Sequence, residues 1–225
     1  MNDAAFWEPL KLSLIVVGSA TVIVSVVGIG LAFVLAKRQF QGRELLDAVV
    51  TLPLVLPPTV TGYYLIVLLG RRGLVGGYLY DATGWTVSFT WQAAVLAASV
   101  MALPLMVKSA RAAIESIDDR YEIASYTLGK SEWETFFRIT LPLARRGIYA
   151  GVVLSFARAL GEFGATLMIA GNIPGRTQTM PLAIYEAVAA GEERRAQALA
   201  LVLTGVSIVA VYLTNKLSNA RSPVF

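Results

Sequence analysis

Long blocks of apolar residues are the feature that most restricts how this chain can fold. The hydrocarbon core of a bilayer is about 30 Å thick, so a helix that crosses it needs about 20 apolar residues. Five stretches meet this requirement, namely residues 12–36, 45–70, 91–107, 147–170 and 196–215. The sequence therefore predicts an all-α, polytopic membrane protein with about five transmembrane helices, built as a single domain over residues 1–225.

Composition agrees with this class and excludes several kinds of chemistry. The chain is 56% hydrophobic with a mean hydropathy of +0.64, which is typical of an integral membrane protein. It contains no cysteine and no histidine, so disulfides, thiolate nucleophiles, imidazole metal ligands and histidine acid–base catalysis are all excluded. We expect a non-catalytic subunit with no metal site and no cofactor of its own.

The basic residues predict an orientation. With the N-terminus outside and the C-terminus inside, the cytoplasmic segments hold 12 of the 19 lysines and arginines, as the positive-inside rule requires. This choice places a loop of about residues 108–146 in the cytoplasm. The outer segments, 71–90 and 171–195, are rich in glycine, aromatics and threonine and are expected to be ordered caps with short surface helices.

The cytoplasmic loop carries signals for two short helices joined at a glycine. Asp119 precedes a helical pattern and Glu122 stands three residues later, which is a capping arrangement. Gly129 is expected to end this helix in the left-handed conformation. Ser131 and Glu134 repeat the arrangement and begin a second helix.

The second helix is expected to end at Pro142 and to carry Trp133, Phe136 and Phe137 on one face. Such a helix can lie on lipid or bind a protein partner. The loop mixes acids with bases, and two capped helices fix a shape that lipid binding does not need. These features favour a protein partner.

The loop resembles a pattern found in the permeases of ABC importers. In that pattern a Glu-Ala-Ala element is followed by a glycine and, nine residues later, by Ile-x-Leu-Pro; here the sequence reads "EIAS", then Gly129, then nine residues and "ITLP". The resemblance departs at "EIAS", where the acid stands one position early and serine replaces an alanine. It implies that the residues coupling the chain to an ATPase are Glu122, Ala124, Ser125, Gly129, Ile139, Leu141 and Pro142.

The resemblance extends over nearly the whole chain. The segments "LPLVLPPTVTGYYLIVLLGRRG", "WQAAVLAASVMALPLMVKSARAAIE", "LSFARALGEFGAT" and "NIPGRTQTMPLAIY" are similar to the permease subunit of molybdate ABC transporters. That family implies a homodimer of permeases in the cytoplasmic (inner) membrane, two cytoplasmic ABC ATPase subunits and an extracytoplasmic molybdate-binding protein. ATP and Mg would then be bound by the partner subunit, and this chain has no Gly-x-x-x-x-Gly-Lys-Ser/Thr phosphate loop of its own.

Polar groups at membrane depth are costly and need an explanation. Arg158 and Glu162 are spaced i, i+4 and can form an ion pair, which either locks helix packing or faces a water-filled route. Prolines in the second span should kink or interrupt it, and threonine hydroxyls could satisfy the freed carbonyls. The candidate translocation pathway therefore comprises Thr59, Thr61, Arg158, Glu162 and Thr166.

Arg71 and Arg72 lie in an outer segment, against the orientation rule. They are candidate contacts for the binding protein, and the alternative is that they meet lipid headgroups.

Three other functions remain open. Tungstate or sulfate could replace molybdate as substrate, since a pore without a tight site hardly separates similar oxyanions. A membrane anchor or scaffold subunit of another complex would keep the amphipathic loop but need no polar groups at membrane depth. A membrane enzyme is the weakest alternative, because the chain has few groups for catalysis.

Overall fold

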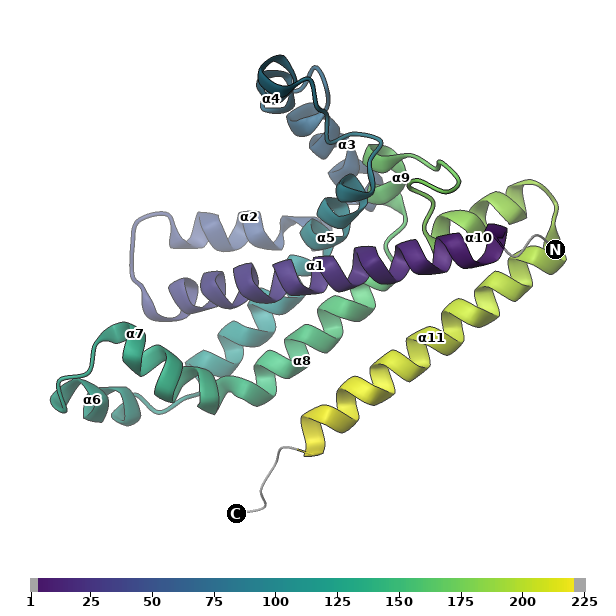
Figure 1. The fold of residues 1–225 in the computed structure, drawn as a ribbon. Helices are drawn as coiled ribbons and strands as arrows, with labels where there is room; N and C mark the ends of the chain where they lie inside the picture. The colour runs from purple at the N-terminus through teal and green to yellow at the C-terminus, as the bar shows by residue number, and fades with distance from the viewer. Residues whose placement is uncertain (1–3, 221–225) are drawn as a thin grey trace.

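The computed structural model describes residues 4–220, and their regular secondary structure is helical throughout. In chain order the elements are α1 (Ala4–Lys37), α2 (Arg43–Val55), α3 (Pro58–Leu69), α4 (Gly76–Thr83), α5 (Trp91–Glu115), α6 (Arg120–Thr127), α7 (Glu132–Thr135), the π-helical turn η1 (Phe136–Thr140), α8 (Leu141–Leu160), α9 (Gly164–Ala170), α10 (Met180–Ala189) and α11 (Glu193–Ala220). Figure 1 shows α1, α5 and α8 packed together, α3 and α4 projecting as an arm, and α6 and α7 at the opposite end. The predicted all-α class is confirmed.

Helix α5 forms the centre of the bundle and packs against both α1 and α8. Its buried residues are mostly small, and Ala93, Ala97 and Ala102 are almost completely shielded. Small residues let helix backbones approach closely in membrane proteins. The approach is tight at Gly147 of α8, where an added Cβ atom would lie 2.4 Å from the Cβ atom of Ala113. Close backbone packing therefore holds the centre of the bundle.

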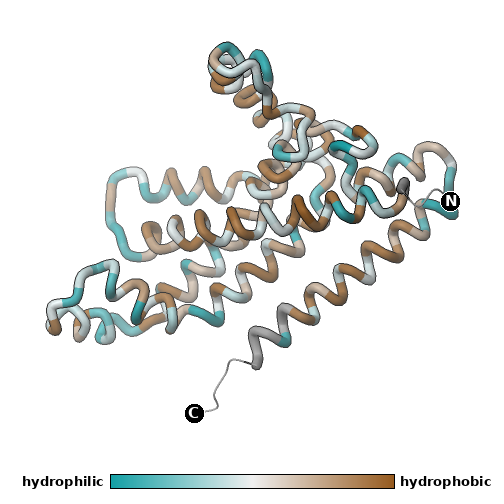
Figure 2. The backbone as a smooth tube through the Cα atoms, in the orientation of Figure 1, coloured by the Kyte–Doolittle hydropathy of each residue, from teal (hydrophilic) through white to brown (hydrophobic). Residues whose placement is uncertain are grey.

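A largely apolar surface surrounds this centre, and Figure 2 shows hydrophobic residues along α1 and α11. Within the described residues, three helices are long and apolar enough to cross a membrane, namely Phe6–Lys37, Trp91–Glu115 and Glu193–Leu213. A bent pair, Glu132–Leu160 with Gly164–Ala170, forms a fourth candidate with an angle of 60°. These four correspond to the first, third, fifth and fourth predicted stretches.

The second predicted stretch, residues 45–70, consists of two helices. Helix α2 ends at Val55 and α3 begins at Pro58, because Pro57 and Pro58 cannot donate backbone hydrogen bonds into a continuous helix. The predicted interruption is confirmed. The predicted threonine support is wrong for Thr61, whose hydroxyl is buried by the packing of α3 and has no partner among the described residues.

Short helices are present in both segments expected to be outer caps. Helix α4 has 8 residues and α10 has 10 residues. The start of α10 is fixed to α1, because the Met180 N–H donates to the Ser13 hydroxyl at 2.7 Å. Between α9 and α10, the Gln178 amide donates to the Asn172 side-chain oxygen at 3.0 Å. The expected helical order of these segments is thus present.

Candidate functional site

A glycine hinge joins the two helices of the loop between α5 and α8. Gly129 follows α6 and adopts φ +75°. The Lys130 N–H donates to the Ser125 carbonyl at 3.2 Å, and the Gly129 N–H donates to the Tyr126 carbonyl at 2.9 Å. These two bonds form a Schellman motif, which satisfies carbonyls at the end of a helix. The left-handed conformation predicted for Gly129 is confirmed.

The predicted cap of the second helix is also present. The Ser131 hydroxyl accepts a hydrogen bond from the Glu134 N–H at 3.3 Å, and the Glu134 carboxylate accepts one from the Ser131 N–H at 3.4 Å. Glu134 additionally pairs with Lys130 at 3.3 Å and with Arg138 at 4.0 Å. Local hydrogen bonds and charges therefore fix the start of α7.

The cap predicted for the first helix is wrong. Asp119 has helical backbone angles and accepts no capping hydrogen bond. Asp118 takes this role, because its carboxylate accepts a hydrogen bond from the Arg120 N–H at 3.0 Å. Glu122, which was expected to complete the cap, points to Lys37 at the end of α1 instead. A tertiary ion pair thus replaces the local hydrogen bond that the spacing predicts.

Glu122 anchors the loop to the bundle. Its carboxylate lies 2.9 Å from Lys37 Nζ and accepts a hydrogen bond from the Thr140 hydroxyl at 2.7 Å, and Lys37 also pairs with Asp119 at 3.2 Å. Burial, with a contribution from the charge of Glu122, raises the pKa of Tyr126. These contacts tie α6 both to the end of α1 and to the turn that leads into α8.

The second helix does not end at Pro142, so that prediction is wrong. The π-helical turn η1 connects α7 to α8, and the Leu141 N–H donates to the Phe136 carbonyl. A π-turn shifts the bonding pattern by one residue, which accommodates a proline that has no N–H to donate. Helices α7 and α8 therefore form one continuous helical segment that runs from the loop into the bundle.

The three aromatic residues of this region lie together, as predicted, because the Phe136 ring is 6.5 Å from the Trp133 ring and 5.0 Å from the Phe137 ring. The Phe136 ring lies 4.6 Å from the Phe33 ring of α1 and is buried. Trp133 and Phe137 are 67% and 59% exposed, and their rings stack at 6.3 Å. The three rings therefore form one cluster, in which Phe136 packs against α1 while Trp133 and Phe137 stay exposed.

Of the other residues predicted to couple the chain to an ATPase, some lie in the interior and some on the surface. The Ser125 hydroxyl shares a hydrogen bond of 2.8 Å with the Thr135 hydroxyl, which joins α6 to α7. Leu141 packs against the main apolar core. Ala124 and Ile139 line a hollow of about 540 Å³ on the surface of the loop.

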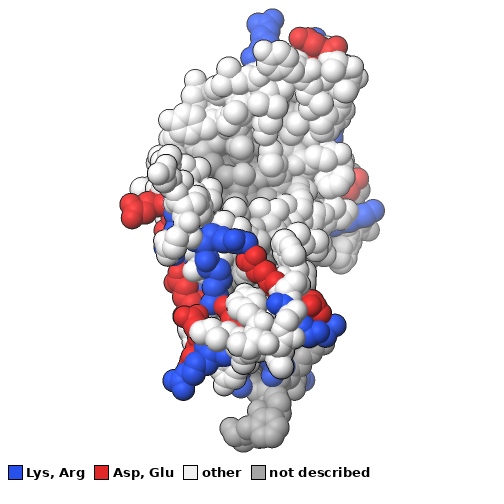
Figure 3. Space-filling view, turned by 90° about the vertical axis from the view of Figure 1, so that its left-hand side faces the viewer, with Lys and Arg blue, Asp and Glu red and all other residues white. Residues whose placement is uncertain are grey.

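The surface around this hollow combines exposed apolar side chains with charged side chains of both signs. Tyr121 and Leu128 line the hollow and are 57% and 79% exposed. Arg138 also lines it. Figure 3 shows acidic and basic side chains interleaved on the end of the molecule that carries the loop. Exposed apolar patches mark interaction sites, and mixed charge fits a protein surface better than anionic lipid.

The candidate pathway residues lie on α3, α8 and α9 and, for Glu162, in the turn between α8 and α9. Helices α3 and α9, which belong to the two interrupted spans, pack against each other. A Cβ atom added at Gly62 would lie 2.8 Å from the Cα atom of Ala165, and one added at Gly164 would lie 2.9 Å from the Cβ atom of Pro58. Glycine at both positions lets α3 and α9 touch. Thr166 is buried in this contact region.

The predicted ion pair between Arg158 and Glu162 is present at 2.7 Å. The Glu162 carboxylate also accepts a hydrogen bond from the Ala165 N–H at 2.8 Å and is only 2% exposed, whereas the Arg158 side chain is 25% exposed. Glu162 therefore both neutralises Arg158 and caps the start of α9. Thr59 is exposed at the start of α3, while Thr61 is buried.

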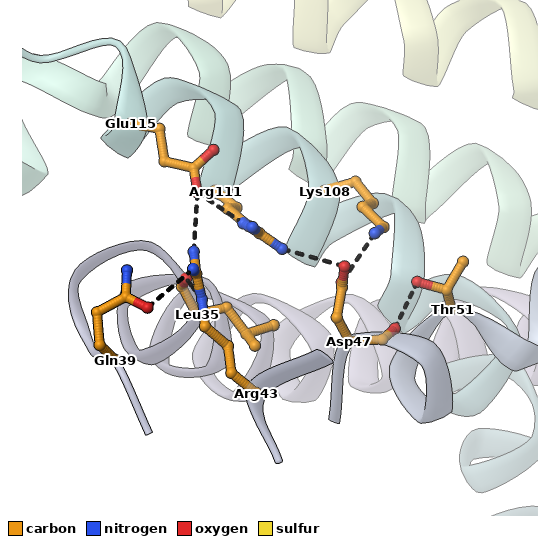
Figure 4. Close-up of polar contacts among 8 residues, drawn as sticks. All are labelled: Leu35, Gln39, Arg43, Asp47, Thr51, Lys108, Arg111 and Glu115. Carbon is orange, nitrogen blue, oxygen red and sulfur yellow. Dashed lines mark hydrogen bonds and ion pairs between the residues drawn. The ribbon is translucent and has the colours of Figure 1, made fainter. Parts of the chain in front are cut away.

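An ion-pair cluster that the sequence analysis missed joins α2 to α5 (Figure 4). Asp47 pairs with Lys108 at 2.8 Å and with Arg111 at 3.1 Å. Arg43 lies 3.5 Å from Glu115, which also pairs with Arg111 at 2.8 Å. The spacing of Lys108 and Arg111 on one helix face is a sequence signal for such a cluster, but their partner lies 61 residues from Lys108. Only the fold brings these charges together.

The two arginines predicted to contact a binding protein lie at the far end of the molecule from the loop, after α3. Arg71 donates to the Tyr80 hydroxyl at 2.6 Å, and its guanidinium carbon lies 4.2 Å from the centre of that ring. Arg72 makes no hydrogen bond or ion pair within residues 4–220. Among these residues no group of three or more acids, histidines or cysteines could hold a metal ion.

Comparisons of sequence identify relatives over almost the full length. Residues 13–221 match the family described as "Binding-protein-dependent transport system inner membrane component". The molybdenum transport system permease protein ModB of Escherichia coli (strain K12) is 46% identical over 214 residues, which cover 95% of this chain and 93% of that relative. The sulfate transport system permease protein CysW of Synechococcus elongatus is 35% identical, over 95% of this chain and 74% of that relative.

Comparison of structures agrees. The crystal structure of a bacterial ABC transporter involved in the import of the acidic polysaccharide alginate matches with a TM-score of 0.78, over 97% of this chain and 80% of that chain. The identity is 18%, so this match shows the fold. Since the family match, the relatives and the fold agree, the chain belongs to the family of binding-protein-dependent transport system inner membrane components, as a non-catalytic, multi-pass permease subunit of an ABC transporter.

Proposed function

We propose that this chain is the permease subunit of an ATP-driven importer that carries molybdate across the cytoplasmic membrane. The observation that carries the proposal is the 46% identity over nearly the whole length to a molybdenum transport permease. The aligned length includes both the loop between α5 and α8 and the interrupted helices, so it covers every element that transport would use.

The proposed coupling is mechanical. The apolar surface of the loop docks on a cytoplasmic ATPase subunit, which binds ATP and Mg. Glu122 and Thr140 then pass a displacement of α6 to α1 and α8, because their contacts join these elements. The proposed assembly is a homodimer of permeases with two ATPase subunits and an extracytoplasmic binding protein. The N-terminus lies outside and the C-terminus inside.

The proposed route follows the interrupted spans. Thr59 and the partly exposed Arg158 offer weak, transient contacts to a dianion, and Glu162 keeps that attraction small. Weak contacts suit transport, because tight binding would prevent release. Selectivity between similar oxyanions then belongs to the binding protein.

Two alternatives remain. Sulfate or tungstate could be the substrate, and the relative named as a sulfate permease supports the former. A membrane anchor or scaffold for another cytoplasmic complex is less well supported, since it would not need polar groups such as Arg158 beside interrupted helices.

The deciding experiment measures ATP hydrolysis in proteoliposomes that contain this chain, its ATPase and a binding protein. Molybdate with its binding protein is expected to raise the rate severalfold above the basal rate. Stimulation by sulfate alone would favour the sulfate alternative. If the ATPase binds but no oxyanion stimulates it, the transport proposal is wrong and the scaffold is favoured.

Substitution of Gly129 by valine is expected to uncouple the loop while the membrane helices still insert. The left-handed conformation costs a non-glycine residue about 1–2 kcal/mol, and a β-branched residue tolerates it poorly. No atom lies within 4 Å of the position a Cβ atom would take, so the substitution tests backbone strain without a clash. Stimulated ATP hydrolysis and co-purification of the ATPase are the measurements.

Gly129→Asn is the matched control, because asparagine enters the left-handed region more readily than other residues. It should retain most of the coupling. Normal coupling in Gly129→Val would contradict the proposed role of the hinge.

A further inference from the structure

A cavity outside the proposed route lies between the turn that follows α3 and the segment that precedes α5. Its volume is about 610 Å³, and Arg71, Arg72, Ser88 and Phe89 are among the residues that line it. Cavities of this size commonly hold ligands. Nothing in the coupling mechanism uses it.

A glycine-rich turn places the arginines at this cavity. The Leu74 N–H donates to the Val67 carbonyl at 3.0 Å, so the chain folds back over the end of α3. A Cβ atom added at Gly73 would lie 2.7 Å from that same carbonyl oxygen. Glycine is therefore required for the turn that brings Arg71 and Arg72 to the cavity.

The cavity has a net positive lining. Both arginines contribute to it, and no acidic side chain does. Contact with the Tyr80 ring and hydroxyl holds Arg71 in place. Arg72 has no hydrogen bond or ion pair in the described part of the chain, so its guanidinium donors are available to a ligand.

Two of the residues that line the cavity carry buried hydroxyls that lack partners among the described residues. Thr86 and Ser88 both have buried hydroxyl oxygens without a hydrogen bond among the described residues, and Ser88 is 8% exposed. A buried polar group without a partner is energetically costly and calls for an explanation. A serine or threonine hydroxyl can rotate and donate one hydrogen bond, so a ligand with acceptor oxygens would satisfy it.

The backbone beside these hydroxyls is strained. Phe89 adopts φ +61°, and it is the one non-glycine residue with positive φ in the described part of the chain. Its N–H donates to the Ile169 carbonyl at 3.0 Å, and its ring closely approaches Gly171. Strain of this kind is concentrated at ligand and switch sites.

We propose that this cavity binds a tetrahedral oxyanion group. The guanidinium groups of Arg71 and Arg72 would neutralise its charge, since arginine forms strong charge-assisted hydrogen bonds with oxyanions. The hydroxyls of Ser88 and Thr86 would donate to its remaining oxygens. The group comes either from the free transported oxyanion at the outer mouth or from the phosphate of a lipid headgroup. Only the first source rests on the proposed transport function.

The test uses the full chain in phosphatidylcholine nanodiscs, without ATPase or binding protein. One arm measures binding of radiolabelled molybdate by equilibrium dialysis, and the other measures retained phosphatidylglycerol by native mass spectrometry. Arg72→Gln should lower the affinity for whichever ligand binds by about tenfold, which is the effect expected from the loss of one charge-assisted contact. Ser88→Ala should weaken it severalfold and serves as a second variant in case Arg72→Gln is unstable. Arg176→Gln removes an equal charge from another exposed outer position and should change neither arm.

Loss of molybdate binding in both variants supports the free oxyanion as the source, and loss of lipid retention alone supports the lipid phosphate. If neither arm responds to Arg72→Gln and Ser88→Ala, the proposal is overturned. Because neither arm requires ATP hydrolysis, a failure here is distinguishable from a failure of transport.

Discussion

Replacement of Glu162 by alanine is expected to destabilise the protein by about 3–5 kcal/mol, the usual cost of removing one partner of a buried ion pair. The substitution leaves Arg158 without its partner at 2.7 Å and removes the acceptor for the Ala165 N–H at the start of α9. The midpoint of thermal unfolding in detergent, followed by the fluorescence of the four tryptophans, is the measurement.

Two further variants separate packing from transport. Glu162→Gln keeps an acceptor for the Ala165 N–H but not the charge, and it should be destabilised less than the alanine variant. The double variant Arg158→Met/Glu162→Gln removes both charges and should recover most of the stability. If this double variant also transports normally, the pair serves helix packing alone and Arg158 is not part of the route. Stability close to wild type in Glu162→Ala would contradict the assigned role of the pair.

Replacement of Glu122 by alanine is expected to abolish coupling and to destabilise the loop by about 3 kcal/mol. The substitution removes the carboxylate that lies 2.9 Å from Lys37 Nζ and leaves the Thr140 hydroxyl without its acceptor. Since α6 would then lose its buried tie to α1 and its tie to the turn into α8, and keep only the exposed Asp119–Lys37 pair, the ATPase should bind weakly or hydrolyse ATP without response to substrate. Co-purification of the ATPase and stimulated hydrolysis are the measurements.

Glu132→Ala is the matched control for Glu122→Ala. Glu132 also pairs with the end of α1, through Arg38, but the two side chains are 39% and 57% exposed. Exposed ion pairs contribute about 1 kcal/mol or less, so coupling should persist in this variant. Equal effects of the two substitutions would show that burial of Glu122 is not what matters.

Local sequence signals were sufficient where the competing contacts are also local. The Ser131–Glu134 cap and the left-handed Gly129 depend on residues within one turn, and both are present as predicted. The Asp119–Glu122 cap has the same spacing and fails. Glu122 instead pairs with Lys37, which lies 85 positions earlier in the chain. A buried charge-assisted contact is more stabilising than an exposed helix cap.

Helix interruptions can likewise be predicted from local sequence, whereas the packing of the resulting helices cannot. Pro57 and Pro58 predict the end of a helix from covalent geometry alone, and the interruption lies where they stand. That α3 then packs on α9, with Gly62 against Ala165, could not be read from either segment. At Pro142 the local expectation failed, because the π-helical turn η1 lets the helix continue past a proline that was expected to end it.

By itself, the sequence determined the membrane class, the positions of most spans, the hinge at Gly129 and the resemblance to importer permeases. These follow from the length of apolar blocks and from interactions between residues a few positions apart. Only the tertiary structure decided that Glu122 is an anchor, that Asp47 bridges α2 and α5, and that Arg72 lines a cavity with Ser88. The physical reason is that the energy of a charge depends on its burial and on the partners within a few ångströms, and both are set by helices distant in sequence.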